Sequence, residues 1–122
     1  MPVTEARLAG RVRRARRIDG RLVLYVEHYL NPTYFPGILE FDLTRSLTEL
    51  YASHYGIYYG RVRFDILPTA LPAVAASALR VAVGSPALRI SRINRDQHGN
   101  IIDCDLEFWR HDAIHVSVEV PQ

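Results

Sequence analysis

Residues 10–30 read GRVRRARRIDGRLVLYVEHYL, and this stretch decides the fold prediction. The dipeptide Asp19–Gly20 is the strongest short signal for a β-hairpin turn. Residues 8–18 before the turn alternate in character, and residues 21–30 after it are rich in Leu, Val and Tyr. The stretch therefore predicts two antiparallel strands joined at the turn.

A capping pattern predicts the first helix. Ser46 is followed three residues later by Glu49, which is the spacing of a capping box, and Gly56 stands where a C-terminal glycine stop belongs. Apolar residues lie between them at helical spacing. We therefore predict a short amphipathic helix over residues 47–55.

The remaining segments complete an α+β pattern. They predict a strand over 57–67, a helix over 71–79 with a proline in its first turn, two strands around a turn at 96–99, and a closing strand over 114–120. Strands joined mostly as hairpins, with two helices among them, predict an antiparallel sheet of about six strands with the helices packed on it.

Length and composition bound the class of protein. At 122 residues the chain is long enough for one core and short for two, so we expect a single domain. No run reaches the roughly 18 apolar residues of a membrane span, and the N-terminus has no apolar signal core, which predicts a cytoplasmic protein. The single cysteine, Cys104, excludes an internal disulfide and offers no metal-ligand cluster.

The net charge of +2 is too small for a dedicated nucleic-acid binder, but the charge is unevenly placed. Six of the fifteen cationic residues fall in the first seventeen positions, and all fifteen are arginine. Alternation in the first strand divides them between two faces. One face carries Arg14 and Arg16 among Val12 and Ile18; the other carries Arg11, Arg13 and Arg17.

Two guanidinium groups on a mainly apolar face have two interpretations. Their stems can cover apolar surface while the charged heads reach water. Alternatively they bind an anion, because a buried charge without a partner costs several kcal/mol. The arginines of the other face form a solvated surface or contact DNA or another domain.

A collinear set of motifs runs along the chain. It begins with Arg14, Arg16, Asp19 and Gly20, followed by Glu-x-Tyr-Leu at 27–30. It continues with YFPGILEFDLTRSL at 34–47, HYGI at 54–57, ALRVAVGSPALRISRINRDQHGNII at 78–102 and WRHD at 109–112. In this order the motifs resemble the UTRA domain, the effector-binding half of HutC-type regulators within the GntR family, whose fold is that of chorismate lyase.

The resemblance implies a single domain over residues 1–122 that binds a small effector and forms homodimers. In the family such a domain controls an N-terminal winged helix-turn-helix, which we expect this chain to be too short to include. The implied effector is a small anionic or zwitterionic metabolite, with no cofactor and no catalytic residue. Two other functions stay open: a chorismate-lyase-like enzyme acting on a small carboxylate, and direct nucleic-acid binding through residues 7–17.

The same resemblance assigns candidate effector-binding residues in the first half of the chain. It implies that Arg14 and Arg16 contact the acidic or phosphorylated part of the effector. Alternation on the second strand places Glu27 beside them, together with Tyr29, so that Glu27 either neutralises an arginine or accepts a hydrogen bond from the effector. We expect the ligand between the sheet and the loop at 31–41, which contains Phe35.

The second half contributes acidic candidates. Asp105 and Glu107 share a strand face at positions where the family usually has small hydroxyl residues, which favours an effector with a cationic group or internal Arg–carboxylate pairing in the ligand-free state. Arg110 either contacts the ligand or holds a turn with Asp112. His111 and His115 have the spacing of a helical metal pair, but their segment is predicted as turn and strand, so no metal is expected.

Overall fold

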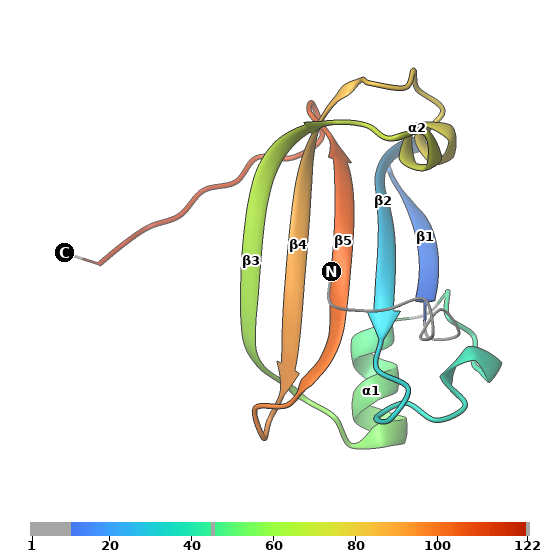
Figure 1. Cartoon of the computed structure of the whole chain (residues 1–122), viewed down its shortest axis with the longest axis vertical. Coiled ribbons are helices and arrows are strands. Elements are labelled where there is room, and N and C mark those ends of the chain that lie inside the picture. The colour runs from blue at the N-terminus through green and yellow to red at the C-terminus, as the bar shows by residue number, and fades with distance from the viewer. Residues whose placement is uncertain (1–10, 45, 122) are drawn as a thin grey trace.

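The computed structural model describes residues 11–44 and 46–121. Its centre is a five-stranded antiparallel sheet of order β1-β2-β5-β4-β3, which Figure 1 shows nearly face on. The strands are β1 (Arg11–Ile18), β2 (Arg21–Leu30), β3 (Tyr59–Ala70), β4 (Pro86–Asp96) and β5 (Ile101–Arg110). The helices are α1 (Leu47–Tyr55), α2 (Ala73–Leu79) and the short 3-10 helix η2 (Ile38–Glu40). The predicted α+β class is confirmed.

The first hairpin forms as predicted. Asp19 and Gly20 have φ values of 51° and 80°, the left-handed pair that a two-residue hairpin turn requires. Beyond the turn the register slips: Arg17 pairs with Leu22, but Arg16 pairs with Leu24. Val23 is therefore an extra residue in β2, a β-bulge that shifts all later pairs of the hairpin by one.

Residues that pair directly across antiparallel strands lie on the same face of the sheet, so the register defines the two faces. One row runs through Arg14, Val26, Glu107, Ile90 and Ile66, and the next contains His28, Asp105, Arg92 and Phe64. We call this the α1 face, because Tyr51 of α1 bonds to Asp103 of the same side. The opposite face contains the row Arg13, Glu27, Leu106, Ser91 and Asp65, and we call it the α2 face.

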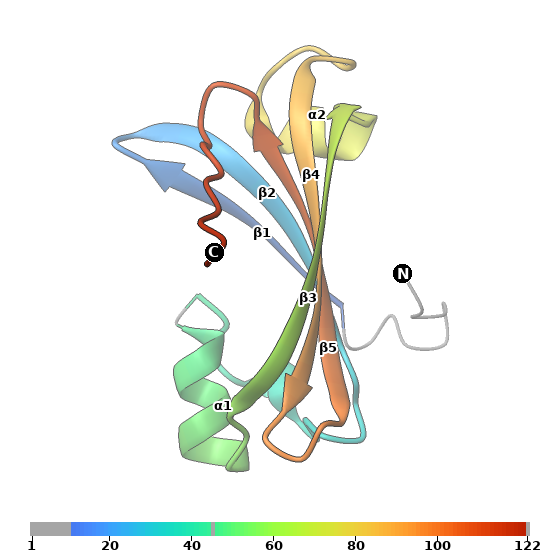
Figure 2. The same cartoon turned by 90° about the vertical axis from the view of Figure 1, so that its left-hand side faces the viewer.

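Helix α1 has the predicted ends. The Ser46 hydroxyl accepts a hydrogen bond from the Glu49 amide at 3.3 Å, and Gly56 ends the helix with φ 63°. The inner side of α1 packs against the loop that follows β2 and against the sheet, and together they form an apolar cluster. Figure 2 shows α1 beside the lower end of the sheet. The cluster contains Leu30, Phe35, Ile38, Leu47, Tyr51, Ile57 and Ile102.

Helix α2 covers the other face at the opposite end of the strands (Figure 1). Ala75, Ala76 and Leu79 of this helix are at most 2% exposed and pack with Tyr25 and Phe108 of the sheet. The two helices thus anchor opposite ends and opposite faces. Arg14 and Arg16 of β1 lie on the α1 face.

The predicted closing strand is wrong for this structure. Residues 114–121 are extended but pair with no strand among the described residues, so the sheet has five strands rather than about six. An alternating sequence favours the extended conformation without specifying which strand it will pair with. No helix in the described part of the chain is long and apolar enough to cross a membrane.

Candidate functional site

A pocket of about 300 Å³ lies on the α1 face, between the sheet and the start of α1. Strands β1, β2, β4 and β5 supply its charged side chains, and the segment at 44–48 supplies hydroxyl groups. The lining residues are Arg14, Arg16, His28, Thr44, Ser46, Leu47, Thr48, Tyr59, Arg92 and Asp105. Three arginines thus face a single carboxylate, that of Asp105.

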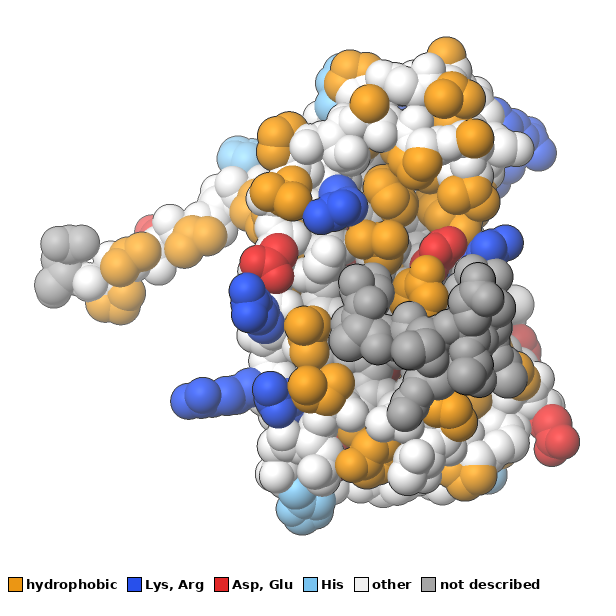
Figure 3. Space-filling model, viewed as in Figure 1, with side chains coloured by type: hydrophobic (Ala, Val, Ile, Leu, Met, Phe, Trp, Pro, Cys, Tyr) orange, Lys and Arg blue, Asp and Glu red, His pale blue; other side chains and the backbone are white. Residues whose placement is uncertain are grey.

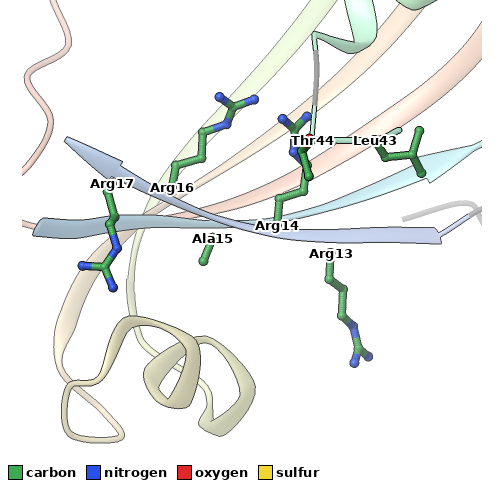
Figure 4. Close-up of a pocket in the computed structure, with 7 residues that line it drawn as sticks. All are labelled: Arg13, Arg14, Ala15, Arg16, Arg17, Leu43 and Thr44. Carbon is green, nitrogen blue, oxygen red and sulfur yellow. The ribbon is translucent and has the colours of Figure 1, made fainter. Parts of the chain in front are cut away.

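Arg14 and Arg16 project from the same side of β1, toward Thr44, whereas Arg13, Ala15 and Arg17 project from the other side (Figure 4). The predicted division is confirmed for these four arginines, while the side chain of Arg11 lies outside what the structure describes. Within the described residues neither Arg14 nor Arg16 has a carboxylate within 4 Å. Burial lowers the pKa of the Arg14 guanidinium below its usual value, and the charge of Arg16 lowers it further. Among the described residues the pair thus concentrates positive charge, which the more distant Asp105 offsets only in part at Arg14.

The same pair also borders an outer groove of about 490 Å³ along the β1 edge, with Leu43 and Thr44 (Figure 4). That groove is larger but opens on both faces of the edge strand, because Arg13 and Arg17 line it too. The pocket on the α1 face is better suited to a ligand, since convergent polar groups from four strands meet there.

A second cluster of charged and polar side chains, around Asp105, lines the pocket on the side of the sheet. The Nδ1 atom of His28 lies 2.6 Å from Asp105 Oδ1, and Arg92 Nη1 lies 3.9 Å from both Asp105 and Glu107. The guanidinium of Arg92 also stacks over the Phe64 ring at 5.2 Å. Among the described residues, the buried atoms His28 Nε2 and Arg92 Nε have no hydrogen-bond partner. Both residues line the pocket, so hydrogen-bonding capacity remains beside its cavity.

A buried hydrogen-bond network around Asp103 joins α1 to the sheet. The Tyr51 hydroxyl and the Asn94 amide each donate to this carboxylate at 2.6 Å. Burial, followed by repulsion from Asp105, raises the pKa of Asp103 to about 6, although the two donated hydrogen bonds act in the opposite direction. Burial likewise raises the pKa of Tyr51 far above its usual value. The network attaches α1 to the sheet directly beside the pocket.

Glu27 and Tyr29 do not lie beside Arg14 and Arg16, contrary to expectation. Glu27 is on the α2 face, where it lies 3.5 Å from Arg13 Nε and accepts hydrogen bonds from the hydroxyls of Tyr25 and Tyr29. The bulge at Val23 is the cause. A regular two-residue hairpin would pair Glu27 with Val12 on the α1 face, but the extra residue pairs it with Arg13 instead.

Phe35 and Arg110 are also outside the pocket. Phe35 is 2% exposed and its ring stacks on Tyr51 at 4.3 Å, which makes it a core residue. Arg110 lies 3.1 Å from Asp112, which also pairs with Arg21, so the alternative of a turn held by an Arg–Asp pair is the one observed. The expected loop at 31–41 does not line the pocket; the following segment at 44–48 does.

Asp105 and Glu107 lie on the α1 face as expected and are paired internally. Asp105 bonds to His28 and lies near Arg92, and the indole of Trp109 donates to Glu107 at 2.8 Å. Arg92 is therefore the arginine that balances the acidic residues, which leaves Arg14 and Arg16 available. Asp105 is only 5% exposed, so this side of β5 is not a charged solvent face.

Sequence reasoning missed His28, Arg92 and the hydroxyl residues at 44–48. His28 could have been found from its position next to Glu27. A change in register by one residue moves His28 to the side of the sheet that carries Arg14 and Arg16, and moves Glu27 to the opposite side. Arg92 lies in the predicted strand before the second turn, where alternation alone does not identify the face that reaches the pocket. In the described part of the chain no group of three or more His, Cys, Asp or Glu residues could hold a metal ion.

Comparison with protein families gives one match over nearly the whole chain. The family model described as UTRA domain matches residues 3–115. Among curated proteins, the uncharacterized HTH-type transcriptional regulator YihL of Escherichia coli (strain K12) is 28% identical over 103 residues. The match covers 84% of this chain and 44% of that protein, so the chain spans less than half the length of this relative.

Solved structures share the fold. PhnF from Mycobacterium smegmatis superposes with a TM-score of 0.84 at 24% identity, covering 92% of this chain and 50% of that one. The effector domain of PhnF gives 0.79 at 25% identity, covering 87% and 69%. The C-terminal domain of Yurk from Bacillus subtilis gives 0.83 at 14% identity, covering 90% and 77%, which supports the fold alone.

Proposed function

The chain belongs to the UTRA domain family, and from this we propose that it is the effector-binding and dimerisation domain of a HutC-type GntR-family transcriptional regulator. In this proposal a small anionic or zwitterionic metabolite binds in the pocket on the α1 face. The domain performs no chemistry on it. An attached winged helix-turn-helix binds operator DNA in the cytoplasm, and the ligand changes the affinity of that domain for its operator.

The observation that carries the proposal is the pair Arg14 and Arg16 in the pocket with no carboxylate within 4 Å among the described residues. Two adjacent guanidinium groups repel each other, and an anion bound between them would remove that repulsion while accepting charge-assisted hydrogen bonds. Asp105 does not cancel this attraction, because it is already engaged with His28 and Arg92.

The rest of the ligand would meet hydroxyl and imidazole groups. Thr44, Ser46 and Thr48 line the pocket, as does His28, whose buried Nε2 has no hydrogen-bond partner among the described residues. In the neutral ring this atom accepts a hydrogen bond if Nδ1 donates to Asp105. A compact polar metabolite with one anionic end and a hydroxyl or amino group fits these groups better than an apolar ligand.

Ligand binding can alter α1 through the pocket residues that precede and begin it, Ser46, Leu47 and Thr48. An effector shifts a regulator only if it binds one arrangement of the dimer better than another. Contacts to both β1 and the start of α1 would supply such a difference, since they depend on the distance between these two elements.

The proposal is tested by titration calorimetry with inorganic phosphate, preceded by a thermal-shift screen of sugar phosphates, amino acids, imidazoles and phosphonates. Loss of a charged hydrogen-bond donor costs about 1.5–3 kcal/mol, so Arg14→Ala or Arg16→Ala should weaken binding of the best compound by roughly 10- to 100-fold. Arg17→Ala is the matched control, because Arg17 is on the same strand but projects from the other side.

An affinity that is unchanged in the double variant Arg14→Ala/Arg16→Ala would show that the assigned site is wrong. Retained binding in both arginine variants together with a strong loss on Glu27→Gln would move the site to the α2 face.

A further inference from the structure

Strand β3 is an exposed edge with an apolar side. Val62, Phe64 and Ile66 are 42%, 52% and 41% exposed on the α1 face, the alternating residues Arg63 and Asp65 lie on the α2 face, and Arg61 lies in the irregular stretch before Val62. Only one edge of this strand pairs within the described residues, with β4. A twelve-residue edge of this kind is a template for another strand, and natural proteins rarely leave one uncovered.

The C-terminal segment at 114–120, which we call the tail, has the complementary pattern. Ile114, Val116, Val118 and Val120 alternate with His115, Ser117 and Glu119. The tail is extended, and Val118 and Val120 are 79% and 68% exposed. Figure 1 shows it passing the end of β3 and leaving the sheet on that side, and Figure 3 shows its hydrophobic side chains standing clear of the body.

We propose that the tail of one copy of this chain adds as a sixth strand to the β3 edge of a second copy, with the reciprocal contact completing a twofold dimer. Residues 62–66 of β3 and the tail both place apolar side chains on one side and polar ones on the other, so strand addition buries the valines against Val62, Phe64 and Ile66. The predicted sixth strand is then supplied by the partner. This inference rests on the dimerisation part of the proposed function and extends it.

Charge favours the same pairing. Strand β3 carries the exposed Arg61 and Arg63, of which Arg63 lies 3.3 Å from Asp65, and the polar side of the tail carries Glu119. A tail on the edge of a second copy brings this carboxylate over the arginines, whereas two β3 edges paired directly would bring four of these arginines together. The observations therefore favour the tail over a second β3 strand as the occupant of the edge.

The first test is the oligomeric state of the chain by sedimentation velocity. We expect a dimer, and expect truncation after Ala113 to weaken it by more than about 100-fold, because eight buried apolar side chains leave the interface. Val118→Asp should act in the same direction. Val83→Asp is the matched control: Val83 is 69% exposed, but it lies in the loop after α2, away from the β3 edge.

A charge exchange distinguishes pairing between copies from folding of the tail onto its own chain. Glu119→Arg alone and Arg61→Glu/Arg63→Glu alone each place like charges together and should weaken self-association about tenfold. Mixing the two variants should restore the dimer, because each tail then meets an edge of opposite charge. If the tail paired within its own chain, mixing would restore nothing, and the proposal would be wrong.

Two outcomes separate this inference from the proposed function. A dimer that survives truncation after Ala113 refutes tail exchange and leaves dimerisation intact. A wild-type chain that is monomeric at all concentrations refutes both tail exchange and dimerisation. Phosphate binding by that monomer would still test the proposed ligand pocket separately.

Discussion

The replacement Asp103→Asn should stabilise the chain at neutral pH. This gain over the wild type should largely disappear at pH 4. Asp103 is 3% exposed, and burial with repulsion from Asp105 raises its pKa from 3.8 to about 6. A carboxyl whose pKa is raised by folding stabilises the native state when it is protonated. Its contribution is therefore complete below about pH 4 and is lost as the pH rises through about 6.

The size of the effect follows from the shift. Each tenfold change in proton affinity is worth about 1.4 kcal/mol, so a pKa that rises from 3.8 to about 6 corresponds to about 3 kcal/mol. The asparagine has the same shape, cannot ionise and can still accept a hydrogen bond from Asn94. The wild-type free energy of unfolding minus that of the variant should thus fall by about 2.4 kcal/mol between pH 4 and pH 7, because a small part of the effect is already lost at pH 4.

Urea titrations of both proteins at steps of half a pH unit measure this difference and cancel the titrations that the two chains share. Asp65→Asn, on the exposed β3 edge, controls for the loss of one negative charge. A difference that stays flat within about 0.5 kcal/mol from pH 4 to pH 8 would refute the account of Asp103 as a carboxyl disfavoured in its charged form by burial.

Further variants test the fold and the choice of function. Leu79→Ala should lower the free energy of unfolding by about 2–5 kcal/mol in urea, because the side chain is 2% exposed in the α2 cluster. Ser46→Ala should cost about 1 kcal/mol through the lost helix cap. In Gly60→Ala the new Cβ would lie 2.3 Å from the Asp96 carbonyl oxygen, so amide-exchange protection should fall where β3 begins. Gel shifts of the chain alone should show no DNA binding even at low salt, and incubation with chorismate should yield no 4-hydroxybenzoate.

Much of the fold could be predicted because local signals agree with the tertiary structure. Asp19–Gly20, the Ser46 cap and the stop at Gly56 act over a few residues, and each appears where the sequence indicates. The separation of Arg14 and Arg16 from their neighbours also follows from the period of a strand alone. None of these features depends on contacts between distant segments.

Half of the candidate site could not be predicted, because it depends on register. Nothing in the sequence of the first hairpin marks Val23 as an extra residue. Yet the bulge at Val23 determines that His28, rather than Glu27, lies on the same face as Arg14 and Arg16. The position of Phe35 depends on the packing of α1, and the tail shows alternation without a partner in the described structure. These are long-range facts that a single sequence does not contain.

The bulge at Val23 also governs how this chain can be compared with its relatives. If β2 kept all its residues but paired without the bulge, Glu27 rather than His28 would pair with Val12 and share the face of Arg14, whereas deletion of Val23 itself would leave the later pairs unchanged. A one-residue deletion in β2 between the bulge and Glu27, with the bulge kept, would instead pair Glu27 with Arg14 and so change the charge on the face of the pocket.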